Sequence, residues 1–156
     1  MIFGIFQSWK KKSKQSIQGL LPFIGELNIS TELTRIRIDS IKQQLLINEQ
    51  DVRNIYCLAF LIGSIESDLQ QYISKEKLDI EKYKGVVLSA YGYSLIERDE
   101  VKDDRQWASE MSKVLAIMSD NDSQWYWRLG LASGGYPTEK SESGWDLFVE
   151  KLRAYA

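Results

Sequence analysis

The stretch 50–73 limits the possible folds more than any other part of the chain. Its apolar side chains recur at steps of three and four residues: Val52, Ile55, Tyr56, Ala59, Ile62, Leu69 and Tyr72. Between Ile55 and Ile65 the stretch is apolar almost all round, which is typical of a helix that other elements contact on several sides. Its uncharged apolar run has nine residues, Ile55–Gly63, whereas a transmembrane helix needs about 20. The pattern therefore predicts the central helix of a bundle and no transmembrane segment.

Amphipathic spacing predicts further helices on both sides of this one. Their expected ranges are 30–47, 79–96, 107–119, 124–133 and 144–155. Before them, Gly19, Pro22 and Gly25 predict a bent or broken helix over 15–27, with a boundary near Asn28.

In the first of these helices, apolar residues are spaced for one broad buried face: Leu33, Ile36, Ile41 and Leu45. Residues 34–39 also alternate with the period of a strand, but no convincing partner strand exists, and we expect helix. In the helix over 79–96, Gly85 and Gly92 lie seven residues apart, so we expect a neighbouring helix to approach there.

The fold class that follows is all-α. We expect an irregular single-domain bundle of about six or seven helices over residues 1–156, with a small α+β fold containing one short hairpin as the alternative. The length of 156 residues suits one domain, and 44% apolar against 27% charged residues suits a packed globule. A net charge of −2 argues against nucleic-acid binding, which depends on many basic side chains.

The residues of the common active sites are missing. The chain has no histidine, which excludes histidine-dependent nucleophilic catalysis. The glycine-rich run 130–135 lacks the Gly-Lys-Ser/Thr ending of a phosphate-binding loop. Asp120 and Asp122 resemble the start of a calcium loop, but Trp125 and Leu131 occupy the positions of its glycine and glutamate. We expect no catalytic residue, metal or cofactor.

The single cysteine and the first residues of the chain indicate the same cellular compartment. Cys57 lies within the apolar run, so we expect a buried and unreactive thiol. The apolar residues 1–6 precede the lysines, which is the reverse of the order in a signal peptide. We therefore expect a soluble protein in a reducing cytoplasm.

Charge is polarised along the chain. Residues 97–122 carry eight acidic and four basic side chains, whereas residues 1–47 carry three acidic and seven basic ones. An acidic surface attracts basic partners and speeds their docking, although an ordinary charged helix face has the same composition.

Aromatic residues follow this acidic stretch. Trp125 and Trp127 point to nearly opposite sides of a helix, so that helix is either sandwiched in the bundle or exposes one aromatic face beside Arg128. Tyr136 lies in the loop after it. The residues predicted to bind a partner are Asp99, Glu100, Asp103, Asp104, Asp120, Asp122, Trp127, Arg128 and Tyr136.

Residues 1–14 form a short amphipathic arm. In such segments, apolar side chains and lysines together hold the helix on an anionic membrane surface. The residues that would contact the membrane are Phe3, Phe6, Trp9, Lys10, Lys11, Lys12 and Lys14. The alternative is a first helix that docks on the domain's own core.

These observations favour a binding protein over an enzyme. We predict a bacterial-style cytoplasmic inhibitor of the immunity-protein or antitoxin kind, which occludes the functional site of a basic partner protein. One alternative is a membrane-peripheral adaptor held by the arm. Another is an enzyme using carboxylates such as Glu66 and Asp68, or Asp103 and Asp104, which requires an acid buried beside a cavity. A homodimer through the aromatic face is a further alternative.

Overall fold

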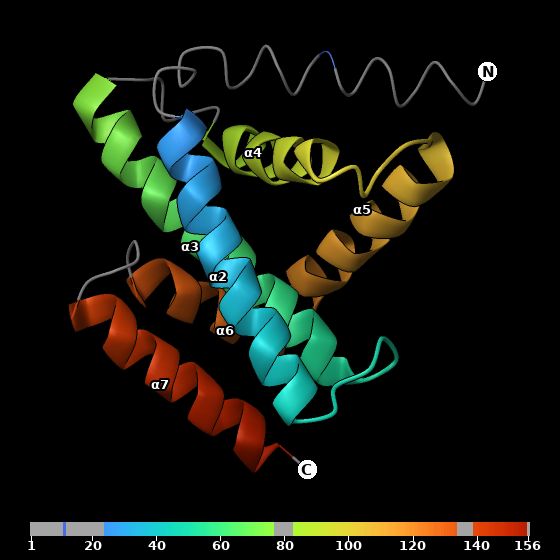
Figure 1. The fold of residues 1–156 in the computed structure, drawn as a ribbon, viewed down its shortest axis with the longest axis vertical. Coiled ribbons are helices and arrows are strands. Elements are labelled where there is room, and N and C mark those ends of the chain that lie inside the picture. The colour runs from blue at the N-terminus through green and yellow to red at the C-terminus, as the bar shows by residue number, and fades with distance from the viewer. Residues whose placement is uncertain (1–10, 12–23, 77–82, 134–138, 156) are drawn as a thin grey trace.

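The computed structural model describes residues 11, 24–76, 83–133 and 139–155, and these ranges are helical with no strand among them. The helices are α2 (Ile24–Gln44), α3 (Val52–Glu76), α4 (Tyr83–Glu97), α5 (Asp104–Ser119), α6 (Asn121–Ser133) and α7 (Glu139–Ala154) (Figure 1). The predicted all-α bundle is confirmed, and the alternative with a hairpin is wrong for the described ranges. Helix α3 continues to Glu76, three residues beyond the end at residue 73 that the sequence predicts.

Helix α3 is the centre of the bundle, as predicted. It packs against α2, α4, α5 and α6, and α7 packs on α6. Its fully buried side chains include Ile62, Ile65 and Leu69, which meet Phe148 and Leu152 of α7 in one apolar core. The all-round apolar pattern of the sequence therefore reflects neighbours on several sides of the helix.

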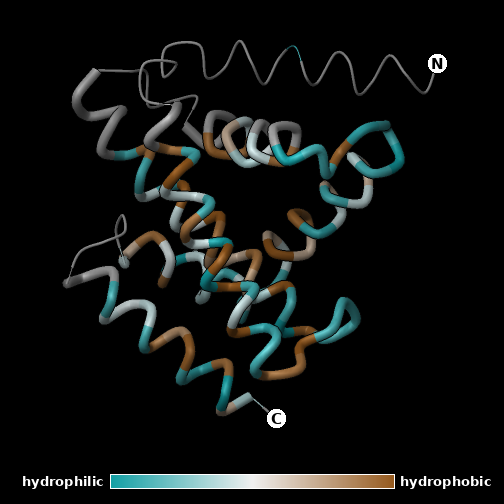
Figure 2. Tube along the Cα trace, viewed as in Figure 1, coloured by the Kyte–Doolittle hydropathy of each residue, from teal (hydrophilic) through white to brown (hydrophobic). Residues whose placement is uncertain are grey.

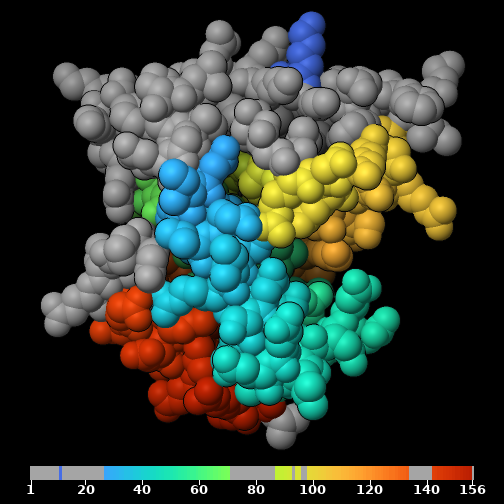
Figure 3. Space-filling view, in the orientation of Figure 1, coloured from blue at the N-terminus to red at the C-terminus, as the bar shows by residue number. Residues whose placement is uncertain are grey.

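Helix α2 differs from expectation in its start and in its buried face. It runs without interruption through Asn28, because Leu27, Ile38 and Ile41 are buried in the core and hold this part of the helix in place. Leu33 and Ile36, expected inside, are 39% and 55% exposed. Ile41 and Leu45 of the predicted face do pack in or against the core, so the prediction is confirmed at that end of the helix and wrong at Leu33 and Ile36. Apolar residues lie on both sides of α2, and periodicity alone did not separate them; Figure 3 shows α2 on the molecular surface beside α7.

The last three helices follow in quick succession, and all three begin earlier than predicted. Helix α5 starts at Asp104 instead of Trp107. Helix α6 starts at Asn121 instead of Gln124, and α7 starts at Glu139 instead of Gly144. Apolar and polar residues alternate along α5 and α7 (Figure 2), as in amphipathic helices with one solvated face. Arg37 of α2 ties α7 to the bundle through two hydrogen bonds to Glu142, 3.0 and 3.2 Å long.

Glycines permit the tightest helix contacts. A Cβ added to Gly63 of α3 would lie 2.1 Å from the carbonyl oxygen of Trp127, and one added to Gly130 of α6 would lie 2.2 Å from that of Phe60. The two backbones therefore touch each other directly. Gly92, for which the sequence predicts such an approach, is buried in α4.

Gly144 has a similar role inside α7 and does not mark its start. A Cβ there would lie 1.8 Å from Ser133 Oγ at the end of α6. None of the helices in the described part of the chain has the length and apolar character that crossing a membrane requires.

Candidate functional site

The predicted acidic residues form two groups at opposite ends of α5. Asp99, Glu100 and Asp103 precede the helix, whereas Asp120 and Asp122 follow it. A helix of 16 residues spans about 24 Å at 1.5 Å per residue. The acidic stretch of the sequence therefore provides two separate acidic surfaces.

In the group before α5, the carboxylates already have partners within the chain. Asp99, at a φ of 59°, forms a 3.3 Å ion pair with Lys102. Glu100 accepts from the guanidinium groups of Arg35 and Arg98 at 3.4 and 2.9 Å. Asp103 is the N-cap of α5 and accepts from the Gln106 backbone at 2.9 Å. Asp104, in the first turn, is half-buried.

In the group after α5, Asp120 joins two helices. Its Oδ2 accepts from the backbone nitrogen of Ser123 at 2.9 Å and from Ser123 Oγ at 2.7 Å, which caps the start of α6. These hydrogen bonds favour the ionised form and hold the pKa of Asp120 below its usual range. Asp122, one residue into α6, is exposed. Asp122 is therefore the carboxylate of this group that remains open to a partner.

The two tryptophans of α6 have different environments. Trp127 is half-buried against the core, and its Nε1 donates to Glu66 Oε2 at 2.5 Å. Trp125 is 38% exposed and is the better placed of the two to contact a partner. Arg128 is exposed, and Tyr136 lies outside the described residues.

Trp125 belongs to an aromatic groove that the sequence analysis missed. The groove has a volume of about 390 Å³ and is lined by Tyr56, Trp125, Tyr126, Tyr155, Asp122, Lys151 and Ala154. The rings of Tyr56 and Tyr126 stack with centroids 4.5 Å apart, and Tyr155 meets Tyr56 edge-on at 5.5 Å. Three helices and the C-terminal end of the described chain supply these residues, so no local sequence pattern connects them.

The electrostatics of the aromatic groove favour a cation. The ammonium of Lys151 lies 5.4 Å from the centroid of the Trp125 ring, within the usual range of a cation–π contact. Burial raises the pKa of Tyr56, and the nearby carboxylates of Asp122 and Asp120 raise it further. The groove thus already holds one basic side chain of its own.

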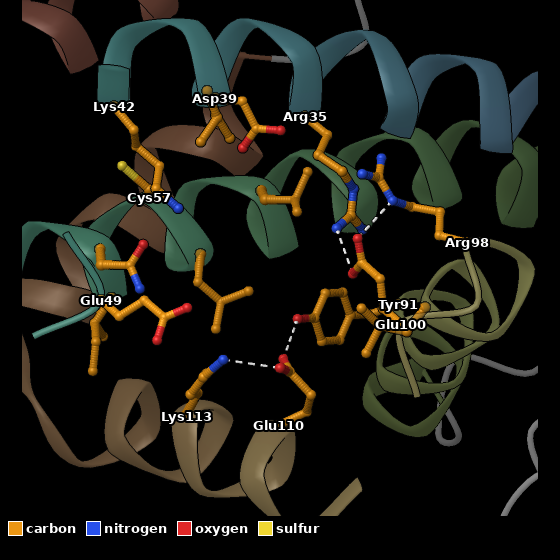
Figure 4. Close-up of a pocket in the computed structure, with 16 residues that line it drawn as sticks. Arg35, Asp39, Lys42, Glu49, Cys57, Tyr91, Arg98, Glu100, Glu110 and Lys113 are labelled. Atoms are coloured by element: carbon orange, nitrogen blue, oxygen red, sulfur yellow. Dashed lines mark hydrogen bonds and ion pairs between the residues drawn. The ribbon is translucent and has the colours of Figure 1, made fainter. Parts of the chain in front are cut away.

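A second feature is the polar cavity, a space of about 330 Å³ bounded by α2, α3, α4 and α5, by the loop between α2 and α3 and by the residues after α4 (Figure 4). Eight charged side chains line it, four of each sign: Arg35, Lys42, Arg98 and Lys113 with Asp39, Glu49, Glu100 and Glu110. Its wall on α3 is largely apolar, with Ile55, Leu58 and Leu61 beside Asn54 and Cys57. The cavity is therefore balanced in charge and amphipathic in lining.

Ion pairs occupy two sides of the polar cavity. Glu110 accepts from Tyr91 Oη at 3.0 Å and from Lys113 Nζ at 2.8 Å. Across the cavity, Glu100 lies between Arg35 and Arg98, as Figure 4 shows. Arg98 also pairs with Glu32. Burial raises the pKa of Tyr91, since its phenol is shielded from solvent between these groups.

The acids named for an enzyme alternative lie elsewhere. Asp68 is buried, and burial raises its pKa while Ser30 Oγ donates to it at 2.6 Å. Neither Asp68 nor Glu66 lines the polar cavity, the aromatic groove or the two pockets beside α2. Burial raises the pKa of the Cys57 thiol to about 12, as expected of an unreactive cysteine.

The membrane arm lies outside the described residues except for Lys11, which is exposed. Over the described ranges, no cluster of three or more histidine, cysteine or acidic side chains is placed to hold a metal ion.

Comparison with known proteins adds no relative to this description. No family model matches the chain, and no curated protein or solved structure matches it either, so the function proposed for it rests on the residues of its own surface.

Proposed function

We propose that the chain is a non-catalytic protein-binding domain that acts in the cytoplasm as an inhibitor of the immunity-protein kind. Its partner is a basic protein, and a lysine or arginine of that partner enters the aromatic groove. The observation that carries the proposal is the joint presence of Trp125, three tyrosines and the open carboxylate of Asp122 around one groove.

Physical chemistry supports this choice of ligand. Aromatic faces attract cations, and an adjacent carboxylate adds a charge-assisted hydrogen bond. Lys151 at 5.4 Å from the Trp125 ring acts as an intramolecular stand-in for the partner's side chain. Tryptophan and tyrosine are also the residues on which binding energy concentrates at interfaces.

Site-specific photo-crosslinking in native cells tests the proposal. A benzoylphenylalanine at position 155 lines the groove, and the same probe at position 147 is the control, since Leu147 is similarly exposed, 38% against 42% for Tyr155, and does not line the groove. We expect one basic protein to crosslink from position 155 and not from position 147. Equal labelling from both positions would contradict the groove as the interface.

Affinity for the purified partner then tests the individual residues. Trp125→Ala should weaken binding by more than about tenfold, as expected for an interface hot spot. Lys151→Gln should strengthen binding, because the resident cation no longer competes for the ring. Leu147→Ala should leave the affinity unchanged. Inhibition is a separate measurement: an equimolar amount of the chain should abolish the partner's own activity.

The membrane-peripheral alternative stays a prediction. Liposomes containing anionic lipid would bind the full chain and not a chain lacking residues 1–14. Such binding, together with the absence of a groove-dependent protein partner, would favour that alternative over the inhibitor.

A further inference from the structure

The polar cavity contains positive groups whose hydrogen-bonding capacity is not used. Arg35 is 9% exposed, and its Nε is buried without a hydrogen-bond partner. Its contacts to Glu100 Oε2 and Ser94 Oγ measure 3.4 and 3.3 Å, which lies beyond the usual hydrogen-bond range of about 2.7–3.2 Å. A buried guanidinium held this loosely can donate a hydrogen bond to a further oxygen ligand.

Lys42 provides a second positive group on the same side of the cavity. It lies seven residues after Arg35, hence on the same face of α2, and both residues line the polar cavity. Its ammonium forms no ion pair with any carboxylate in the described ranges. By contrast, Lys113 across the cavity is already bound to Glu110 at 2.8 Å.

The wall of the cavity on α3 indicates what the rest of the ligand must be. Ile55, Leu58 and Leu61 of α3 present an apolar surface to the cavity. Because four carboxylates also line the cavity, each additional negative charge on a ligand is repelled, which favours a ligand with a single negative charge over a multiply charged anion such as a nucleotide. A molecule with one carboxylate and a short branched hydrocarbon body satisfies both walls.

We propose that the polar cavity is a binding site for a small branched-chain monocarboxylate. The carboxylate accepts from the terminal nitrogens of the Arg35 guanidinium, which are held only at 3.3–3.4 Å, and from the Lys42 ammonium. The hydrocarbon body packs on Ile55, Leu58 and Leu61 of α3. The site is independent of the aromatic groove, so it stands whether or not the chain is an inhibitor.

The test is a titration of the full chain with 4-methylpentanoate, followed by amide chemical shifts. We expect saturable shifts centred on the cavity residues of α2 and α3, and no shifts with 4-methylpentanamide, which has the same shape without the charge. The full chain with leucine shows whether an added ammonium is tolerated, and inorganic phosphate shows whether any anion suffices. Equal responses to the acid, the amide and phosphate would overturn the proposal.

Two variants locate the carboxylate. Arg35→Lys keeps the charge but has no guanidinium fork, so it should weaken 4-methylpentanoate binding by about tenfold or more. Arg105→Lys makes the same chemical change at an exposed residue of α5 and should leave the affinity unchanged. Circular dichroism confirms that both variants fold. Unchanged affinity in folded Arg35→Lys, or no binding to the unaltered chain, would refute the site.

Discussion

Helix α3 meets its neighbours in two opposite ways. Toward α6 it presents Gly63, and the backbones of the two helices touch. Toward α5 it presents Leu58 and Leu61, and a polar cavity of about 330 Å³ separates it from Glu110 and Lys113. The contact with α6 is tight because glycine has no side chain. On the side of α5, long charged side chains keep the two helices apart around the cavity.

The difference teaches where this molecule can tolerate change. A backbone contact cannot yield to an added atom, because no side chain is present to move aside. Charged side chains that border a solvent-accessible cavity can rearrange and remain hydrated. We therefore expect the contact between α3 and α6 to dominate stability, and the contacts around the polar cavity to matter more for ligand binding than for folding.

The largest effect is expected at the glycine contact. Gly63→Ala would place a methyl group 2.1 Å from a backbone oxygen of α6, so the helices must separate, which should destabilise the fold by about 3 kcal/mol or more. Denaturant unfolding measures this change. Gln70→Ala, at an exposed position of the same helix, is the control and should change the stability by less than about 0.5 kcal/mol. A small loss of stability in Gly63→Ala would show that the contact between α3 and α6 does not dominate the stability of the fold.

A medium effect is expected at the corner between α5 and α6. Asp120→Ala removes the cap of α6 and leaves the Ser123 hydroxyl, 1% exposed, without its acceptor. The loss should be about 1–2 kcal/mol, measured by thermal unfolding at neutral pH. Because the folded state lowers the pKa of Asp120, its contribution is present above the ordinary carboxyl pKa and lost as pH falls through the lowered one. If Asp120→Ala destabilised the fold in strong acid as much as at neutral pH, this result would contradict the role of the Asp120 carboxylate.

An effect of opposite sign is expected at Asp68, a buried carboxylate of α3 whose partner is the neutral hydroxyl of Ser30. Burial raises its pKa, so its favourable contribution is present below the ordinary value of 3.8 and is lost as pH rises through the raised one. Asp68→Asn should therefore increase the melting temperature at pH 7, and the increase should vanish as the pH approaches 3.8. If Asp68→Asn instead lowered the melting temperature at pH 7, the charged form of Asp68 would be the favoured one.

The smallest effect is expected at the polar cavity itself. Arg35→Met removes a buried charge but leaves Glu100 paired with Arg98 at 2.9 Å and 40% exposed. Since a buried ion pair adds little over a well-packed apolar side chain, stability should change by less than about 0.5 kcal/mol. Denaturant unfolding beside Gly63→Ala gives the direct comparison. A loss of stability as large as that of Gly63→Ala would show that the two contacts are equally important for folding.

Much of the fold was predictable because it depends on local patterns. The central position of α3 followed from its all-round apolar residues, and the end of α5 at Ser119 was as predicted. The start of α7 was missed, since Gly144 was taken as a boundary although it packs on Ser133 within the helix. A glycine has the same sequence signature in both roles, and only a neighbouring helix distinguishes them.

The candidate sites were less predictable. Asp122 was identified from charge alone, and it borders the aromatic groove. The sequence singled out Trp127, but the structure leaves Trp125 more open, because Trp127 turns toward Glu66 on α3. Most residues of the polar cavity were not identified, although Glu100 was expected to bind a partner. They come from four helices, from the loop between α2 and α3 and from the segment after α4, and partners across the cavity such as Arg35 and Glu100 lie far apart in the sequence.

The sequence by itself determined that the chain is helical and which helix is central. Both properties follow from propensity and from the spacing of apolar residues along one segment. Only the tertiary structure decided which side of α2 is buried, which tryptophan of α6 is exposed and where charged side chains enclose a cavity. These depend on contacts between segments far apart in the chain, and the free energy of such contacts has no counterpart in local periodicity.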